Sequence, residues 1–340
     1  MSASAPASRS SERRPVRVLR VLARRHVDST RMVRPRDFDT ALVAQVPGMS
    51  DIGDGERYVP LCVDWRDARL FLSRWDDDCA MTDVPFLYQR QRRTARQLLD
   101  VPFEQLEAPG RAARMTPIFI FSVGRCGSTL LSRLLAAVGE QAVSEPDVLT
   151  SVAHFDDAAE RAAALPARER IVQSCVAAFE PAPIIKLRAR CNRAVDVFLN
   201  AMPHARYVFM CRNRDDWVRS SSRAFGDSGE ALAELLKASV EAFDRMHAAR
   251  VDPLLVWYED LLADPLAALR RILRARDDLD AHRAAVERAL RADAQEGSGL
   301  SRASLAARTG DAGALAAFDA RWREIRPEAL LREHGLARLR

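Results

Sequence analysis

The segment FSVGRCGSTLLSRLL, residues 121–135, decides the fold of this 340-residue chain. An apolar run over 118–123 stops at a turn with Gly124 and Gly127, and a helical pattern with one apolar stripe follows at once. The glycines permit positive φ, and the start of a helix directs free N–H groups and partial positive charge toward the turn. The segment therefore predicts an anion-binding loop, with a plain strand-to-helix turn as the alternative.

The loop carries its positive charge at an unexpected position. A P-loop NTPase requires GxxxxGK followed by Ser or Thr, in which the lysine binds the β- and γ-phosphates and the hydroxyl helps to hold Mg²⁺. Aligned on Gly127, this chain has Ser122 in place of the first glycine and Ser128 in place of the lysine. The cation is Arg125, inside the turn. We expect Ser128 and Thr129 to cap the helix that follows.

After Pro117 the chain alternates short apolar runs with longer helical patterns. The expected strands are 118–123, 184–187, 207–211 and 254–258, and the expected helices lie near 128–138, 157–180, 192–201, 215–222, 229–249 and 263–276. Such alternation predicts an α/β fold with a mostly parallel sheet flanked by helices. Ligands of these sheets bind at the carboxyl ends of the strands, so we look for site residues there.

The sequence before this domain has a different character. The predicted parts are a disordered tail over 1–15, a small α+β N-terminal region of unknown role over 16–106 and the main domain over 117–340. Within the N-terminal region, 58–65 predicts a strand and 85–99 an amphipathic helix with a basic face. A turn-rich stretch, 107–117, separates this region from the main domain.

Composition limits the class of protein. A net charge of +5 suits an anionic ligand, but without basic clusters paired to aromatic residues it does not indicate nucleic-acid binding. The first residues lack the apolar core of a secretion signal, and no stretch approaches the ~18 to 20 apolar residues of a membrane span. The six cysteines are widely spaced, which indicates reduced thiols in a cytoplasmic protein and neither a zinc site nor disulfides. Oligomeric state is not readable from these features.

A second candidate anion site follows the strand YVFMC, residues 207–211. Arg212 stands at its carboxyl end, and Ser220 follows eight residues later inside the next predicted helix. An arginine can bind a phosphate through two hydrogen bonds while a serine hydroxyl donates a third. The alternative is that Arg212 pairs with Asp215 or Asp216 near the start of that helix.

These two motifs, in this order, resemble those of sulfotransferases that use 3′-phosphoadenosine 5′-phosphosulfate (PAPS), a family whose fold is similar to P-loop kinases. The resemblance covers about 117–276. It implies that Arg125 contacts the phosphosulfate and that Arg212 and Ser220 bind the 3′-phosphate. The implied donor-binding residues of the loop are Gly124, Arg125, Cys126, Gly127, Ser128 and Thr129.

A third segment, VWYEDLLADPLAALRRIL over 256–273, also resembles the family. Either Tyr258 or Trp257 could stack on the adenine, or both could be core aromatics. Glu259 and Asp260 offer a weak Walker-B-like alternative, which favours a kinase or NTP-binding protein that uses Mg²⁺.

The base is expected at Glu145 in AVSEPDVL, twenty residues after Arg125. This spacing is similar to the tyrosylprotein-sulfotransferase branch, in which a glutamate here is the catalytic base. Small-molecule sulfotransferases use a histidine, for which His154 is the candidate. A surface carboxylate is the alternative for Glu145.

Lys186 is one of only two lysines in the chain and lies at the carboxyl end of the predicted strand 184–187, next to its last residue, Leu187. The resemblance implies that it stabilises the leaving oxygen or the sulfonate, whereas the alternative is a lysine that reaches into solvent. Residues 297–310 are similar to the loop that sulfotransferases fold over the nucleotide, with Ser301 and Arg302 as possible contacts.

The sequence thus predicts an enzyme that moves the sulfonate of PAPS to a hydroxyl on a peptide, glycan or small molecule, leaving 3′,5′-ADP and requiring no metal. The two alternatives are a P-loop kinase or NTP-binding protein with Mg²⁺, and a regulator that binds nucleotide without turnover. The motifs describe the donor and leave the acceptor undetermined.

Overall fold

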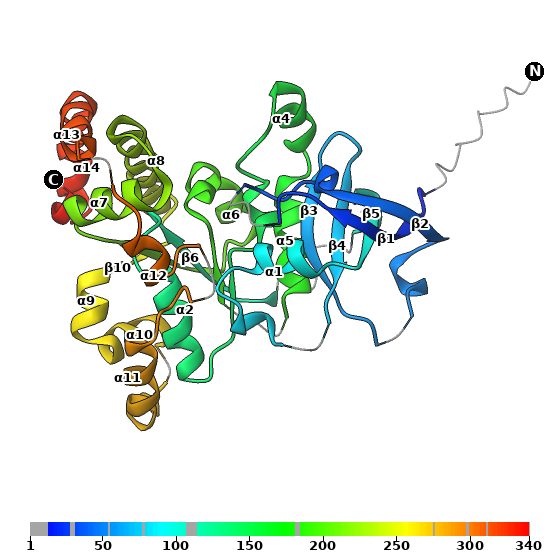
Figure 1. The fold of residues 1–340 in the computed structure, drawn as a ribbon, viewed down its shortest axis with the longest axis horizontal. Coiled ribbons are helices and arrows are strands. Elements are labelled where there is room, and N and C mark those ends of the chain that lie inside the picture. The colour runs from blue at the N-terminus through cyan, green and yellow to red at the C-terminus, as the bar shows by residue number, and fades with distance from the viewer. Residues whose placement is uncertain are drawn as a thin grey trace, which may run out of the picture.

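The computed structural model describes residues 13–27, 31–53, 55–76, 79–106, 114–180, 184–274, 276–296, 299–310 and 312–339. They form an N-terminal antiparallel sheet and a parallel sheet covered by helices, which lie side by side (Figure 1). The main hydrophobic core is continuous between them, since Val59 and Trp65 of the first part belong to the same cluster as Leu131 and Ile171 of the second.

The N-terminal sheet has the strand order β2-β1-β5-β4-β3, with every neighbouring pair antiparallel. Its elements are β1 Val16–Arg24, β2 Phe38–Val46, β3 Tyr58–Asp64, β4 Arg69–Arg74, α1 Leu87–Thr94 and β5 Gln97–Pro102. The predicted strand over 58–65 is confirmed as β3. The helix predicted over 85–99 forms only as α1. The residues from Gln97 onward belong to β5 instead, because they pair with β1 and β4.

The parallel sheet confirms the predicted fold class. Its order is β10-β9-β6-β8-β7, and all four neighbouring pairs are parallel. The strands are β6 Ile118–Ser122, β7 Ala142–Ser144, β8 Ile184–Lys186, β9 Arg206–Cys211 and β10 Leu254–Trp257. The first of them in sequence, β6, is central and buried along its whole length, as expected for a strand covered on both faces.

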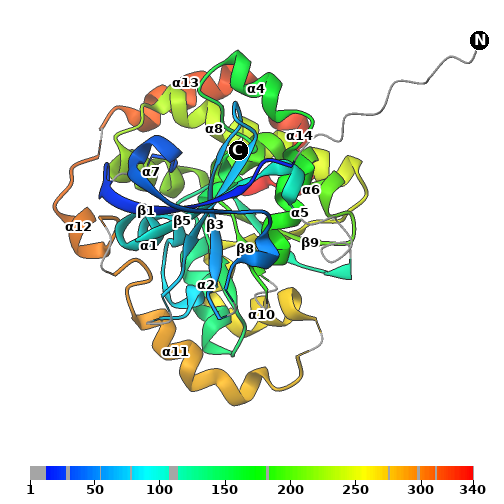
Figure 2. The ribbon, with the colours of Figure 1, turned by 90° about the vertical axis from the view of Figure 1, so that its right-hand side faces the viewer.

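Helices cover both faces of this sheet, with α7, α8 and α13 on one side and α2, α10 and α11 on the other (Figures 1 and 2). The larger helices are α2 Ser128–Ala137, α5 Arg168–Ala178, α7 Arg214–Phe225, α8 Gly229–Ala248, α10 Pro265–Leu273, α11 Arg283–Arg291 and α13 Ala314–Ile325. The shorter ones are α3 Asp147–Thr150, α4 Ala158–Ala164, α6 Val195–Ala201, α9 Tyr258–Ala263, α12 Arg302–Ala306 and α14 Glu328–Glu333.

Two predicted elements have different bounds. The helix expected over 157–180 is divided into α4 and α5, because Pro166 has no N–H to donate and so interrupts the hydrogen bonds of the first helix. The strand expected over 254–258 ends at Trp257, and Tyr258 begins α9. Tyr258 therefore sits where a strand gives way to a helix.

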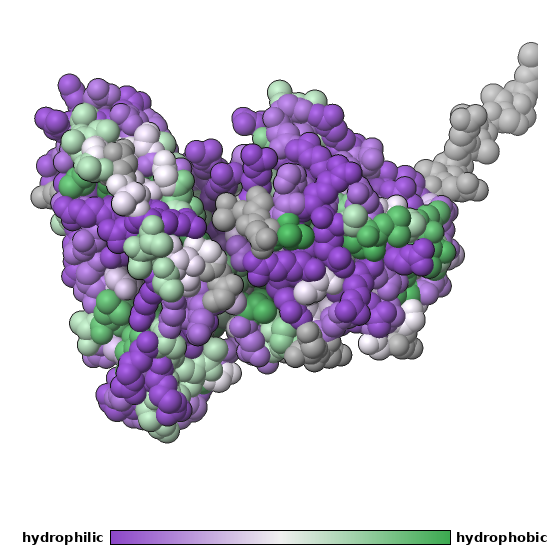
Figure 3. All heavy atoms as spheres, viewed as in Figure 1, coloured by the Kyte–Doolittle hydropathy of each residue, from purple (hydrophilic) through white to green (hydrophobic). Residues whose placement is uncertain are grey.

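The surface carries one exposed apolar patch on the N-terminal sheet. Leu22, Leu42 and Val43 are each more than half exposed and lie on β1 and β2, where Figure 3 shows hydrophobic residues gathered. In the described part of the chain, no helix is long and apolar enough to cross a membrane.

Candidate active site

Each of the five parallel strands delivers a predicted site residue at its carboxyl end. In the spatial order of the sheet these are Tyr258 after β10, Arg212 after β9, the loop 123–127 after β6, Lys186 at the end of β8 and Glu145 after β7. The loop after the central strand divides the edge into two halves. Tyr258 and Arg212 flank it on one side, and Lys186 and Glu145 on the other.

The loop backbone is left-handed at three of its five residues: Gly124 (φ 76°), Arg125 (φ 47°) and Gly127 (φ 81°). Arg125 holds this conformation without the freedom of a glycine, a form of strain that concentrates at functional sites. The indole N–H of Trp217, buried in α7, donates to the carbonyls of Val123 (3.2 Å) and Gly124 (2.8 Å) and so fixes the turn.

The predicted capping of α2 is wrong in detail. Gly127 is the N-cap residue, and Ser128 and Thr129 are the first two residues of the helix without a side-chain cap bond. A left-handed glycine can turn the chain directly into the helix, which leaves the N–H groups of the first turn without a capping side chain. This arrangement favours an external anion at the helix start.

Gly127 lies directly against the ring of Tyr258. A Cβ on Gly127 would approach Tyr258 Cδ2 to 2.4 Å, so no larger residue fits without moving the ring. The close approach joins the loop to the strand end of β10.

We therefore expect Gly127→Ala to displace Tyr258 and to weaken 3′,5′-ADP binding at least ~10-fold, measured by calorimetry. Gly139→Ala is the matched control. It has a similar left-handed φ of 83° but nothing within 4 Å of the added Cβ. Both variants carry the backbone strain, about 1 to 3 kcal/mol, but only Gly127→Ala should lose affinity. Equal nucleotide binding by the two variants would contradict the placement of Tyr258.

Arg125 and Arg212 form a pair of cations without a carboxylate partner among the described residues. Arg125 Nε donates to Ser220 Oγ (3.4 Å) and Nη1 to Gln295 Oε1 (2.7 Å). Arg212 Nη1 donates to the Arg125 carbonyl (3.4 Å), its guanidinium carbon lies 4.8 Å from the centroid of the Tyr258 ring, and its Nε is buried without a hydrogen-bond partner. Burial, and next the charge of Arg212, lower the pKa of Arg125.

Such a concentration of positive charge without a carboxylate partner in the described ranges favours an anionic ligand. The alternative pairing of Arg212 is not observed, because Asp215 pairs with Arg214 (2.9 Å) and Asp216 with Arg219 (3.8 Å).

Glu259 and Asp260, the carboxylates of the Walker-B-like alternative, form contacts within the protein. Glu259 Oε1 accepts from the N–H of Asn213 (3.1 Å) at the start of α7, and Asp260 pairs with Arg338 (2.8 Å). In addition, the Lys186 ammonium donates to the Thr129 hydroxyl (3.2 Å), the type of group on which a P-loop NTPase binds Mg²⁺. A cation in this position disfavours a metal ion there.

Lys186 and Glu145 form an ion pair beside the start of α2. The Lys186 side chain is 2% exposed, and its ammonium donates to Glu145 Oε1 as well as to Thr129. Glu145 has φ 53°, and its N–H donates to the Lys186 carbonyl (2.7 Å). Lys186 therefore does not reach into solvent, and Glu145 is not a surface carboxylate.

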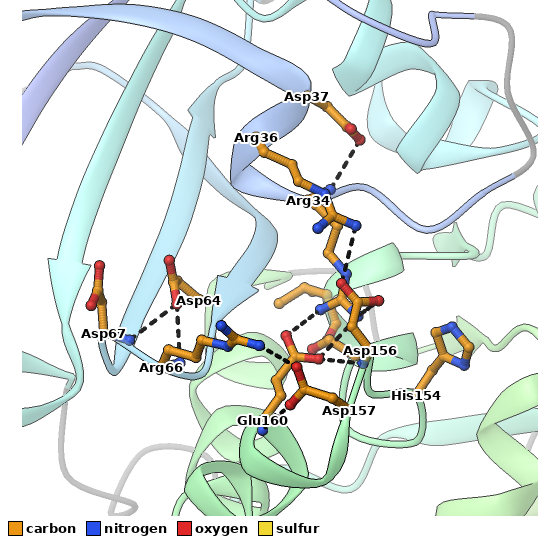
Figure 4. Close-up of polar contacts among 12 residues, drawn as sticks. Arg34, Arg36, Asp37, Asp64, Arg66, Asp67, His154, Asp156, Asp157 and Glu160 are labelled. Atoms are coloured by element: carbon orange, nitrogen blue, oxygen red, sulfur yellow. Dashed lines mark hydrogen bonds and ion pairs between the residues drawn. The ribbon is translucent and has the colours of Figure 1, made fainter.

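His154 lies in a different environment. Its Nε2 is 3.5 Å from Arg190 Nη1, and burial, then Arg190, then Arg34 lower its pKa. Figure 4 shows it next to the polar network of Arg34 and Asp156, before α4 and not at a strand end. The structure thus brings Glu145, and not His154, to the edge that carries the loop.

The C-terminal segment reaches both the loop and the N-terminal sheet. Gln295 contacts Arg125, and Leu300 packs against the N-terminal cluster of apolar residues. Ser301 caps α12 by accepting from the Ser304 N–H (3.2 Å), and Arg302 donates to the carbonyl of Arg291 (3.5 Å). Residues 297 and 298 of the predicted loop lie outside the described residues.

The sequence analysis missed Gln295, Trp217 and Arg188 as site neighbours. Arg188 has a recognisable signal, because it is a second cation two residues after Lys186 at the same strand end. Gln295 and Trp217 have none, since they reach the loop only through tertiary packing.

Part of this chain is similar to known sulfotransferases. Residues 191–277 match the model of the sulfotransferase family, and the matched part contains Arg212, Ser220 and Tyr258. No curated protein has a sequence that matches this chain. Among solved structures, the chain is similar to sulfotransferase STF1 from Mycobacterium tuberculosis H37Rv (type 1 form), with 15% identity and a TM-score of 0.38, covering 66% of this chain and 78% of that one.

The family model confirms the resemblance to sulfotransferases over residues 191–277. The parallel sheet with its loop after the central strand is the P-loop-like arrangement that the resemblance implies. Sulfonate transfer is the class of activity that this match indicates. Kinship with the tyrosylprotein branch stays a prediction.

Proposed function

We propose that this chain transfers the sulfonate group of PAPS to a hydroxyl-bearing acceptor in the cytoplasm, without a metal ion. The observation that carries the proposal is the pair Arg125 and Arg212, two cations without a carboxylate partner in the described ranges, at the start of α2 and beside Ser220 and Tyr258. A donor with phosphates at both its 5′ and 3′ positions needs two such cations, whereas a nucleoside triphosphate needs a lysine and Mg²⁺ on one phosphate chain.

In this proposal, different residues bind different parts of PAPS. Arg125 and the N–H groups at the start of α2 bind the 5′-phosphosulfate, and Arg212 with Ser220 binds the 3′-phosphate. Tyr258, which lies against both Gly127 and Arg212, packs against the adenosine.

The other half of the site acts on the acceptor. As the acceptor oxygen bonds to sulfur, the bond from sulfur to the 5′-phosphate oxygen breaks and that oxygen keeps the electron pair. Glu145 takes the proton of the acceptor hydroxyl, and Arg125 and Lys186 stabilise the negative charge on the leaving oxygen. Lys186 suits this role because its ammonium lies between Glu145 and Thr129.

The donor assignment predicts that 3′,5′-ADP raises the melting temperature without Mg²⁺. At ~100 times its dissociation constant, a ligand adds about 2.7 kcal/mol to the free energy of unfolding, which a melting curve resolves. ATP and GTP, with or without Mg²⁺, should have little effect. Stabilisation by ATP only when Mg²⁺ is present would favour the kinase alternative and contradict the proposal.

A further inference from the structure

We propose that the N-terminal region completes the catalytic site, because Tyr88 together with Asp147 keeps the Arg188 guanidinium from forming a close, hydrogen-bonded ion pair with Glu145 and so preserves Glu145 as a base. Tyr88 and Asp147 are positioning residues in this inference. It rests on the proposed function of Glu145, and it assigns a role to a region that the family resemblance does not cover.

The backbone around Glu145 is held from the N-terminal region on both sides. Before it, Ser144 Oγ donates to the carbonyl of Pro85 (2.7 Å). After it, Asp147 Oδ2 accepts from the N–H of Val33 (2.6 Å). Two separate segments of the N-terminal region thus fix the short stretch that carries the base.

The same region packs aromatic rings on both cations next to Glu145. The Lys186 ammonium lies 5.3 Å from the centroid of the Phe86 ring, and the Arg188 guanidinium carbon lies 4.6 Å from that of Tyr88. Both rings are almost completely buried. A desolvated contact between a cation and an aromatic face orients the cation as well as stabilising it.

Arg188 pairs with Glu145 and Asp147 of the described residues, and Asp147 is the closer of the two. Its Nη1 donates to Asp147 Oδ1 at 2.6 Å, whereas its Nε is 4.0 Å from Glu145 Oε2. The Asp147 side chain is fully buried, so this ion pair acts in a poorly screened environment. Asp147 is therefore the closer partner of Arg188, and this contact opposes a direct hydrogen bond from Arg188 to the base.

The surroundings of Arg188 and Tyr88 determine their protonation states. Burial would lower the pKa of Arg188, but the negative charges of Asp147 and Glu145 raise it, so the guanidinium stays charged. Burial, followed by the charge of Glu145, raises the pKa of Tyr88 to about 12. Tyr88 is thus a neutral phenol at physiological pH and acts through its ring.

The test is the pH dependence of kcat with PAPS and a phenol acceptor, whose acidic limb reports protonation of the base. Four charged or titratable groups of the described residues surround Glu145. Lys186 is the last residue of β8, and Arg188 follows two residues later. Tyr88 belongs to α1 and Asp147 to α3. Changing the partner of Arg188 should therefore move this limb while the affinity for 3′,5′-ADP stays unchanged.

Asp147→Asn leaves Glu145 as the nearest carboxylate to Arg188. We expect the acidic limb to move to lower pH by about 1 unit and the plateau kcat to fall about 10-fold, since a base next to an opposite charge is weaker. Arg188→Gln removes the cation, so the limb should move to higher pH. In the double variant, the acidic limb should lie at the same pH as in Arg188→Gln alone, because Asp147 acts through Arg188.

Tyr88→Leu and Tyr88→Phe test the ring without altering a charge. Leu should lower kcat about 3- to 30-fold, and Phe should restore most of it, because Phe keeps the aromatic face. Glu160→Gln is the matched control. It removes a carboxylate that pairs with Arg34 (2.8 Å) across the same boundary (Figure 4), and it should leave the limb in place.

If Asp147→Asn and Arg188→Gln shift the limb in the same direction, or if Phe fails to rescue Leu at position 88, the inference is wrong. Both of these measurements are possible only if the wild-type protein turns over PAPS. Absence of turnover in the wild type, with 3′,5′-ADP bound, would instead overturn the proposed function.

Discussion

Glu145→Gln is expected to reduce turnover about 10²- to 10⁴-fold while 3′,5′-ADP still binds with nearly wild-type affinity. Gln keeps the shape of the side chain and an oxygen for the Lys186 ammonium, but it cannot accept the proton of an acceptor hydroxyl. Transfer from labelled PAPS to a panel of small phenols and sugars measures turnover, and calorimetry with 3′,5′-ADP measures binding.

The ion pair with buried Lys186 makes stability a necessary part of this experiment. Removing one partner of a buried pair leaves the other charge poorly compensated and costs up to about 3 to 5 kcal/mol. Glu140→Gln is a matched control, because Glu140 is similarly shielded and also paired, with Arg276 at 2.7 Å, but lies outside the site. Glu140→Gln should lose some stability and keep its turnover.

Two comparisons identify the base. Arg125→Ala should lose both turnover and donor affinity, since in the proposed function its charge contacts the phosphosulfate before and during transfer. His154→Ala should change neither. An active Glu145→Gln beside an inactive His154→Ala would transfer the assignment to the histidine.

The sequence predicted the strand-end residues better than the architecture around them. Tyr258, Arg212, the loop and Lys186 stand at or just after the ends of predicted strands, and a parallel sheet brings the carboxyl ends of its strands to one edge, whatever their order. Glu145 follows β7, a strand that the sequence analysis did not predict, and it was singled out only through the family-like spacing after Arg125.

The N-terminal sheet could not be derived in the same way. β5 contains Gln97, Leu98 and Leu99, residues that are equally suited to a helix, and only its position between β1 and β4 makes it a strand. The contacts of Phe86 with Lys186 and of Tyr88 with Arg188 depend on that packing. No local pattern indicates them.

The second large effect is expected at the 3′-phosphate. Arg212→Ala should weaken 3′,5′-ADP about 10- to 150-fold, the loss of a charge-assisted hydrogen bond worth roughly 1.5 to 3 kcal/mol. The same change should have little effect on 5′-AMP, which lacks the 3′-phosphate. Arg212 also donates to the Arg125 carbonyl, so its loss could disturb the loop. Such a disturbance would weaken both nucleotides equally, and the ratio of their affinities therefore reports the 3′-phosphate contact alone.

Arg214→Ala is the matched control for this prediction, because Arg214 lies two residues further on but is already paired with Asp215 (2.9 Å) and Asp319 (3.3 Å). Its charge is compensated within the protein, so its removal should leave both affinities unchanged. Arg212 pairs with no carboxylate of the described residues, and its buried Nε has no partner, so a phosphate would satisfy both its charge and its donor. Equal losses for 3′,5′-ADP and 5′-AMP in Arg212→Ala would show that this arginine supports the loop and does not bind the 3′-phosphate.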